Sequence, residues 1–490
     1  MRNPVIYADY PDLDVIRVGD TYYMVSTTMH MFPGGDILQS KDLVHWELCC
    51  HMYERLDSTP AQKLEEGFIY GKGMWAASLR YHEGVFHVVF VCNDTHRSYH
   101  LTAENPAGPW TYHPMEGFYH DCSILFDDDG RVYLAYGNRE IHIQEMNPDL
   151  SGPKEGGLHR IAIVDPDDVT LGFEGTHLYK INGYYYLFMI HWHRDGNRRR
   201  TEACYRADSI DGVFTGRDIL DDDMGFFNQG VAQGGIVDTP DGKWYAMLFQ
   251  DHGACGRMPV LVPMRWEDDF PVMDGAPAEL IGFHEAPEKP LHPLISSDSL
   301  RGEELADWWQ WNHEPDLSRV NLTQEGLVLH ALPAADFELA RNTLTQRTSG
   351  PVSAFEVTLD ASGLQPGDRA GLAALQGCYA TLCVERVGEG WQLVLCERNF
   401  KEKQGHDTAC APIASPVVRL RAEFDFTDLK DQARFFWHDG EGWQQIGEAH
   451  QLRYTLDHFM GTRIGLCCYG KAGDEAGYAV FRDFVYQAEC

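Results

Sequence analysis

The chain has 490 residues, with 40 basic and 74 acidic side chains and a formal net charge of −34. A chain of this length is expected to fold into more than one domain. A strongly negative protein repels nucleic-acid phosphates and anionic lipid surfaces, and no window holds the roughly 20 apolar residues of a membrane helix. We therefore expect neither a nucleic-acid partner nor a membrane partner.

The opening segment and the cysteines bear on where the protein works. Residues 1–9 lack the apolar run of a secretion signal. The 13 cysteines are odd in number and lack the spacing of a disulfide framework or a zinc site. Our interpretation is a cytoplasmic protein with free thiols and no zinc.

A repeat organises the first half of the chain. Five turn glycines are each followed by a run of aromatic and β-branched residues, which is typical of a β-hairpin. They are Gly19, Gly84, Gly130, Gly183 and Gly242. Successive glycines are 46 to 65 residues apart, enough for one four-stranded blade each time. The pattern predicts a five-bladed β-propeller, and the alternative is a large all-β sandwich or barrel with unrelated hairpins.

The second half of the chain has a different character. Residues 286–300 are rich in proline and poor in strand-forming residues, which predicts a linker. Beyond them come about ten short strand-like runs without a helical period. The sequence therefore predicts an all-β fold class, with a propeller in residues 1–285 and a concanavalin-like or jelly-roll-like β-sandwich in residues 301–490.

Several polar residues share one position in the repeat. In a propeller, the strand before each turn glycine lines the central channel, so residues at one offset from the glycine converge. Trp75, Asp121, Glu174 and Gln233 each stand nine residues before a turn glycine, and Asp12 stands seven before the first. A difference of two preserves the facing of a strand side chain. Three carboxylates close together in a channel repel one another, which raises the pKa of at least one of them. Glycoside hydrolysis needs one protonated and one ionised carboxylate. The sequence therefore predicts a catalytic site formed by Asp12, Asp121 and Glu174.

Three segments carry a resemblance to a known family. They are NPVIYADYPDLDVIRVGDTYYM around Asp12, HDCSILFDDDG around Asp121 and FEGTHLYKINGYYYL around Glu174. Each resembles a motif of glycoside hydrolase family 43, the five-bladed β-xylosidases and α-L-arabinofuranosidases, and DWWQWNHEPDLSR resembles the start of the sandwich in its two-domain members. The resemblance implies that Asp12 is the general base, Glu174 the general acid, and Asp121 the residue that tunes pKa and orients the substrate.

The resemblance also implies a set of substrate-binding residues. Trp75 in MWAASLRY would stack on a sugar, and Arg257 in ACGRMPVL would bind its hydroxyls. Met29 in TTMHMFPG stands where xylosidase-type members tend to place an aromatic side chain against the sugar, and Phe32 of the same stretch is a further candidate for substrate binding. Gln233 stands where many members have a histidine near a bound cation. The chemistry is expected to need no cofactor, and a structural Ca²⁺ with oxygen ligands stays open.

If these roles carry over, the mechanism is inverting. The sandwich of such members is expected to send a loop to the mouth of the site, which implies exo-cleavage of one terminal α-L-arabinofuranose or β-D-xylose. The expected partners are xylan-derived or arabinoxylan-derived oligosaccharides, and both the preferred pentose and a homo-oligomeric state stay open. Two alternatives are a catalytically silent glycan-binding propeller and a propeller glycoside phosphorylase, which would need a phosphate-binding cluster of cations beyond Arg257.

Overall fold

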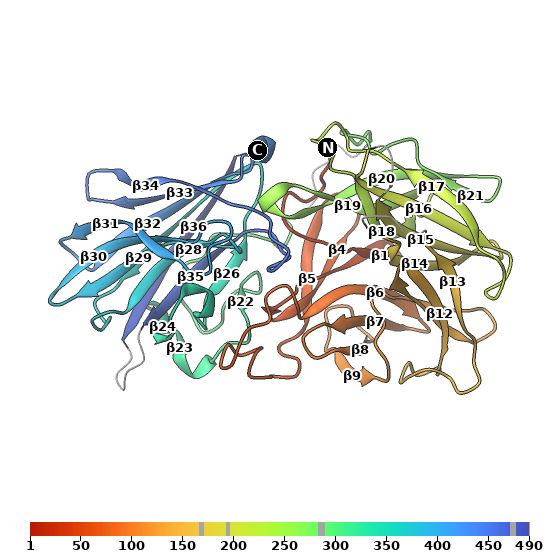
Figure 1. Cartoon of the computed structure of the whole chain (residues 1–490), viewed down its shortest axis with the longest axis horizontal. Helices are drawn as coiled ribbons and strands as arrows, with labels where there is room; N and C mark the ends of the chain where they lie inside the picture. The colour runs from red at the N-terminus through yellow and green to blue at the C-terminus, as the bar shows by residue number, and fades with distance from the viewer. Residues whose placement is uncertain (166–170, 193–196, 283–289, 471–476, 490) are drawn as a thin grey trace.

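The computed structural model describes residues 1–165, 171–192, 197–282, 290–470 and 477–489. They form a β-propeller and a β-sandwich that lie side by side (Figure 1). Four short 3-10 helices accompany the strands, and these are η1 (Gly253–Cys255), η2 (Leu317–Arg319), η3 (Phe337–Leu339) and η4 (Thr427–Leu429). Within the described ranges, no helix is long and apolar enough to cross a membrane.

The propeller has five blades, each a four-stranded antiparallel sheet. Blade one contains β1 (Asp14–Val18), β2 (Thr21–Ser26), β4 (Gly34–Ser40) and β5 (Trp46–Tyr53). Blade two contains β6 (Met74–His82), β7 (Val85–Cys92), β8 (Arg97–Ala103) and β9 (Thr111–Met115). Blade three contains β10 (Ser123–Phe126), β11 (Val132–Asn138), β12 (Glu140–Met146) and β13 (His159–Val164). Blade four contains β14 (Glu174–Ile181), β15 (Tyr184–Trp192), β16 (Arg200–Ala207) and β17 (Thr215–Leu220). Blade five contains β18 (Val231–Asp238), β19 (Trp244–Asp251), β20 (Arg257–Glu267) and β21 (Phe270–Val272).

The turn glycines lie where the repeat predicts them, between the first and second strand of each blade. All five adopt left-handed backbone angles, with φ between 64° and 88°, which glycine reaches without steric cost. The first strands β1, β6, β10, β14 and β18 neighbour one another around the ring. The N-terminal segment closes the ring, because the Val5 N–H donates to the Pro259 carbonyl of β20 at 2.8 Å.

The propeller core lies between blades, and β15 illustrates why these residues form strands. Tyr185, Leu187 and Met189 pack in a buried cluster with blade three, whereas Tyr186 and Phe188 pack in a cluster with blade five. The alternation has the period of two that a strand imposes on its side chains. A strand with two apolar faces is therefore stable only between two neighbouring blades.

The sandwich consists of two sheets that enclose one apolar core. The first sheet contains β22 (Gln310–Asn312), β26 (Leu344–Arg347), β35 (Arg463–Gly470), β28 (Arg369–Leu375), β29 (Ala380–Val387), β30 (Gly390–Glu397) and β31 (His406–Ile413), with β25 (Leu332–Pro333) paired to β35. The second sheet contains β23 (Val320–Thr323), β24 (Gly326–His330), β36 (Tyr478–Glu489), β27 (Val352–Asp360), β32 (Val417–Asp425), β33 (Gln432–His438) and β34 (Trp443–Gln451). Residues 286–289 of the predicted linker lie outside the described residues.

One strand from the propeller part of the chain joins the sandwich. β3 (Met31–Phe32) lies between β2 and β4 in sequence, but it pairs with β22, where Phe32 stands opposite Trp311. The first sandwich sheet therefore continues into blade one. The two domains share backbone hydrogen bonds as well as side-chain contacts.

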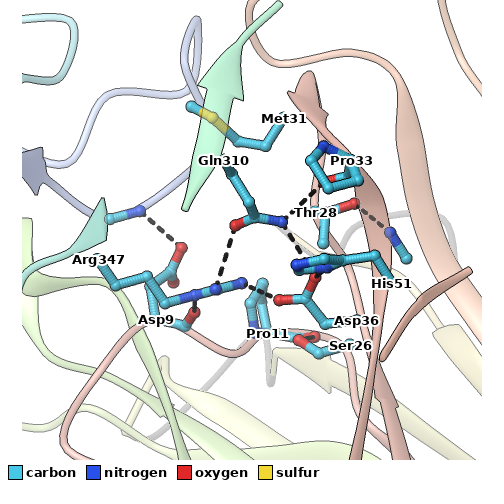
Figure 2. Close-up of polar contacts among 12 residues, drawn as sticks. Asp9, Pro11, Ser26, Thr28, Met31, Pro33, Asp36, His51, Gln310 and Arg347 are labelled. Atoms are coloured by element: carbon cyan, nitrogen blue, oxygen red, sulfur yellow. Dashed lines mark hydrogen bonds and ion pairs between the residues drawn. The ribbon is translucent and has the colours of Figure 1, made fainter. Parts of the chain in front are cut away.

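A buried polar network joins the domains beside this strand (Figure 2). The Asp36 carboxylate, which is 0% exposed, accepts hydrogen bonds from Arg347 at 2.7 Å and from Gln310 at 3.0 Å, and it contacts the His51 ring nitrogen at 2.8 Å. Burial alone would raise the pKa of Asp36, but Arg347 and His51 together hold that pKa well below its usual value. The network therefore contains an ionised carboxylate matched to a buried guanidinium.

Replacing Asp36 should destabilise the protein. Asp36→Ala would leave the guanidinium of Arg347 buried without its counter-charge, so we expect a loss of about 3 to 5 kcal/mol of stability. Thermal and denaturant unfolding would measure it. Asp20→Ala is the control, because Asp20 pairs with Lys41 at the exposed surface and its loss should change stability little. Equal unfolding midpoints for both variants would contradict the role assigned to the network.

Candidate active site

Three of the five residues singled out by the repeat have an unusual backbone. Asp12, Asp121 and Gln233 adopt φ values of 53°, 49° and 59°. A residue with a Cβ atom pays about 1 to 3 kcal/mol for such a conformation, which persists only where the surrounding structure holds it in place. Asp12 and Asp121 stand two residues before the first strands of blades one and three. The departure from regular strand geometry sets the direction of these side chains.

The other two stand at irregularities within their strands. The pairing register of β14 shifts between Glu174 and His177, and that of β6 shifts between Trp75 and Ser78. Such bulges re-aim a side chain that a regular strand would point elsewhere. All five predicted channel residues therefore stand where the innermost strand of a blade is locally irregular.

Gly175, which follows Glu174, brings three of these residues together. The Gly175 N–H donates to Asp121 Oδ2 at 3.1 Å, which places Glu174 beside Asp121. A Cβ atom added to Gly175 would lie 2.6 Å from the Gln233 side-chain amide carbon. Asp121, Glu174 and Gln233 thus form one cluster, as the shared offset predicts.

Asp12 has a cationic partner. Arg257 Nη1 donates to Asp12 Oδ1 at 2.6 Å, and the two side chains are only 3% and 8% exposed. Burial raises the pKa of Asp12, and the charge of Arg257 limits that rise. The pair favours an ionised Asp12 because protonation would leave the guanidinium unmatched.

Asp121 and Glu174 share a different environment. His120 Nε2 lies 3.7 Å from Asp121 Oδ2 and 3.8 Å from Glu174 Oε2, and the Asn138 amide donates to Glu174 Oε2. Burial, followed by the charges of Glu174 and Asp12, raises the pKa of Asp121 to about 7, although His120 opposes the rise. The charge of Asp121 in turn raises the pKa of His120 to about 9. This cluster can hold a proton near neutral pH.

The same cluster offers ligands to a metal ion. One nitrogen of His120 and one oxygen each of Asp121 and Glu174 lie within 4.8 Å of one another. This donor set of one imidazole and two carboxylates suits a transition metal better than Ca²⁺, which takes six to eight oxygen ligands. A metal ion bound here would compete with the proton for Glu174. A structural Ca²⁺ near Gln233 stays a prediction.

Aromatic side chains from both domains flank the carboxylates. Trp75 packs against Phe459 with ring centroids 5.3 Å apart and against His120 at 5.9 Å. The Arg257 guanidinium lies over the Phe459 ring, 4.7 Å from its centroid. Phe459 belongs to the segment before β35, so the sandwich contributes a residue to the site. Solvent reaches this side of the cluster, since the side chains of Glu174 and His120 are 18% and 22% exposed.

Met29 and Phe32 occupy different places. Met29 is buried in the cluster against which Trp75 and Phe459 pack. It therefore lies close to these two rings, which form the aromatic wall of the site. Phe32 is 1% exposed, its ring packs against Tyr53, and its backbone pairs with β22. The packing gives Phe32 a role in the core and at the domain boundary, and its contact with a sugar stays a prediction.

Sequence reasoning missed three residues of this site. His120 directly precedes Asp121 in the HDCSILFDDDG motif, and this position could have identified it as a residue of the site. Asn138 ends β11 and reaches Glu174 from 36 residues away, and no pattern in the chain marks it. The resemblance implied a sandwich loop at the site but did not identify Phe459.

The fold and the site together define a class of protein. A propeller channel holds one carboxylate matched to a guanidinium and, beside it, a carboxylate cluster that retains a proton, next to an aromatic wall. An ionised and a protonated carboxylate flanking a bound sugar are the groups that hydrolyse a glycosidic bond. The class is therefore a glycoside hydrolase.

Known proteins identify the family within this class. Residues 1–271 match the family described as Glycosyl hydrolases family 43, and residues 297–487 match the Beta xylosidase C-terminal Concanavalin A-like domain. The chain belongs to glycoside hydrolase family 43. These matches confirm the predicted family and the predicted pairing of a five-bladed propeller with a concanavalin-like sandwich.

Individual relatives cover nearly all of this chain. The bifunctional GH43-CE structure from Bacteroides eggerthii is 40% identical, with a TM-score of 0.92 over 100% of this chain and 64% of its own. A β-xylosidase of Formosa agariphila is 27% identical over 99% of this chain and 90% of its own. A non-reducing end α-L-arabinofuranosidase of Bacteroides ovatus is 27% identical over 84% of this chain and 80% of its own. The chain thus spans less than two thirds of the bifunctional relative and most of the other two.

The proton held by the cluster predicts a pH dependence. Because the pKa of Asp121 is raised to about 7, Asp121 carries a proton below that pH and loses it above. We expect kcat/KM for an unactivated oligosaccharide to fall as pH rises through about 7. His120→Asn removes the cation that opposes this rise, so the falling limb should move to higher pH. A limb that stays in place in the variant would contradict the electrostatic role of His120.

The aromatic contact across the domains predicts a binding effect. Phe459→Ala removes the ring that packs on Trp75 and Arg257, and we expect kcat/KM to fall about tenfold, mainly through a higher KM. Steady-state kinetics would measure the change. Tyr478→Ala is the control, because Tyr478 is an aromatic residue of the sandwich that is 45% exposed and packs on His330. Equal kinetics for the two variants would exclude Phe459 from the site.

Proposed function

We propose that the protein is an exo-acting, inverting glycosidase that releases one terminal pentose from xylan-derived or arabinoxylan-derived oligosaccharides. The pentose is β-D-xylose or α-L-arabinofuranose. Asp12 acts as the general base on a water molecule, Glu174 as the general acid on the departing oxygen, and Asp121 tunes the protonation of Glu174. In this mechanism no covalent intermediate forms.

The different surroundings of Asp12 and Glu174 carry the proposal. Asp12 is buried and bonded to Arg257, which favours the ionised form that a base requires. Glu174 is partly exposed and lies beside Asp121, in the cluster that holds a proton near neutral pH. Two carboxylates in unlike environments divide the roles of acid and base.

The substrate class rests on relatives and on the aromatic wall. Relatives that match 99% and 84% of this chain are named a β-xylosidase and a non-reducing end α-L-arabinofuranosidase. Phe459 of the sandwich packs on Trp75 and limits the site on that side, which favours a site for one terminal sugar over an open cleft. Trp75 offers its ring face for stacking on the pentose.

The phosphorylase alternative has less support. A phosphate would need free cations beside the carboxylates, but Arg257 is hydrogen-bonded to Asp12 and Arg200 to Asp251 at 2.6 Å. The cation His120 is already shared by the carboxylates of Asp121 and Glu174. Hydrolysis is therefore the reaction that the charges favour. Product analysis with and without added phosphate separates the two, since a phosphorylase would form a sugar phosphate.

Two substitutions on two kinds of substrate test the roles. Glu174→Gln should slow hydrolysis of xylobiose or an arabinoxylo-oligosaccharide by about 10² to 10⁴-fold. It should slow 4-nitrophenyl pentosides much less, because nitrophenolate departs with little help from an acid. Asp12→Asn should slow both kinds of substrate alike, since both need an activated water.

Asp20→Asn, which changes an exposed carboxylate paired with Lys41, controls for loss of charge alone. Steady-state rates on 4-nitrophenyl β-D-xyloside and α-L-arabinofuranoside also decide which pentose is preferred. The proposal fails if wild-type protein hydrolyses neither class of pentoside, or if Glu174→Gln loses the same factor on activated and unactivated substrates.

A further inference from the structure

Asp9 makes two contacts that no catalytic role explains. It lies three residues before Asp12 and is 7% exposed. Its Oδ1 accepts a hydrogen bond from the backbone N–H of Arg257 at 2.8 Å, and its Oδ2 accepts one from the backbone N–H of Gly461 at 2.8 Å. Arg257 begins the third strand of blade five, whereas Gly461 belongs to the sandwich. One carboxylate therefore holds the backbones of both domains.

The surrounding backbone is packed directly against this carboxylate. A Cβ atom on Gly256 would lie 2.3 Å from Asp9 Oδ1, and one on Gly461 would lie 2.7 Å from Asp9 Cβ. Both distances are far below van der Waals contact, so glycine is required on either side of Asp9. The arrangement allows no water between the carboxylate and the two N–H groups it binds.

The segment that carries Asp9 is fixed from a third direction. Arg347 Nε donates to the Asp9 carbonyl at 2.7 Å (Figure 2). The Arg347 guanidinium also stacks on the Tyr10 ring at 3.9 Å, and the Tyr10 N–H donates to the Arg257 carbonyl at 2.9 Å. The position of Asp9 is thus set by the sandwich as well as by blade five.

The two backbones that Asp9 binds carry side chains of the candidate active site. The Arg257 side chain is hydrogen-bonded to Asp12, and Phe459 stands two residues before Gly461. The two side chains also touch each other, since the guanidinium lies over the Phe459 ring. Charge-assisted hydrogen bonds of this kind are stronger than neutral ones and fix geometry.

We propose that Asp9 is a positioning residue that couples the sandwich to catalysis. Its carboxylate sets Arg257 and the Phe459 segment, residues 452–462, at fixed positions relative to the segment of Asp12. The sandwich is then a working part of the active site, and its loop cannot move without moving the partner of the general base. This inference rests on the proposed function for its kinetic consequences but not for its structural ones.

The test replaces Asp9 by asparagine, which has the same shape. One of the two oxygens becomes an NH₂ group that faces an N–H, so one backbone contact is lost. We expect faster amide hydrogen exchange in residues 452–462 and a fall in kcat/KM on a 4-nitrophenyl pentoside of up to about 100-fold, the effect of a displacement near 1 Å. Glu65→Gln is the matched control, because Glu65 also joins the propeller to the sandwich, through Arg341 at 3.0 Å, and contacts neither Arg257 nor Gly461.

A double-mutant cycle separates positioning from stability. If Asp9 acts through the Phe459 segment, Asp9→Asn should cost much less in a Phe459→Ala background than in the wild type. Equal costs in both backgrounds, or a kinetic loss matched by Glu65→Gln, would overturn the inference. Unchanged hydrogen exchange in residues 452–462 would overturn it as well. The exchange experiment needs no activity, so it decides the matter even if the proposed pentosidase function fails.

Discussion

A charged carboxylate is costly to bury without a partner, and two fully buried carboxylates of this acidic chain are each matched by a cation from another segment. At the centre of the channel, Arg80 of blade two donates to Asp14 of blade one at 2.7 Å. At the domain boundary, Arg347 of the sandwich donates to Asp36 of blade one at 2.7 Å. Both aspartates are 0% exposed, and removing one partner of such a pair leaves an uncompensated buried charge. The pairs therefore fix the positions of blades and domains more firmly than apolar packing alone.

The chemistry of the site follows from which of its carboxylates have a cation in direct contact. Asp12 has a guanidinium in contact, and this favours its charged form. Asp121 and Glu174 instead have the imidazole of His120 at 3.7 Å and 3.8 Å, which does not offset the effect of burial on Asp121, so the pKa of Asp121 rises to about 7. Two unlike protonation states in one channel are what an inverting glycosidase needs.

The local parts of this architecture could be predicted from the sequence. The turn at Gly183 needs a left-handed backbone, and the aromatic run after it becomes β15. A shared offset from such turns also placed Asp121 and Glu174 in one cluster, because each blade repeats the same strand geometry. The catalytic roles of these residues stay predictions, since the structure gives their surroundings but not their reactions.

The long-range parts could not be predicted. Phe459 reaches the site from the sandwich, and Asp9 binds Gly461 across 452 positions of the chain. No periodic pattern in the sequence predicts such contacts, because they depend on how the two folded domains pack against each other. The place of Phe32 depends on the same docking, because β3 crosses to the sandwich sheet and buries its ring against Tyr53, and its contact with a sugar stays a prediction.

The stereochemistry of the first product tests the central claim most directly. Proton NMR of freshly hydrolysed 4-nitrophenyl β-D-xyloside, or of the α-L-arabinofuranoside if that is the better substrate, shows the anomer released before mutarotation. With Asp12 activating water on the face opposite the leaving group, the first sugar should have the inverted configuration. Release of the sugar with its configuration retained would require a covalent intermediate and would contradict the account.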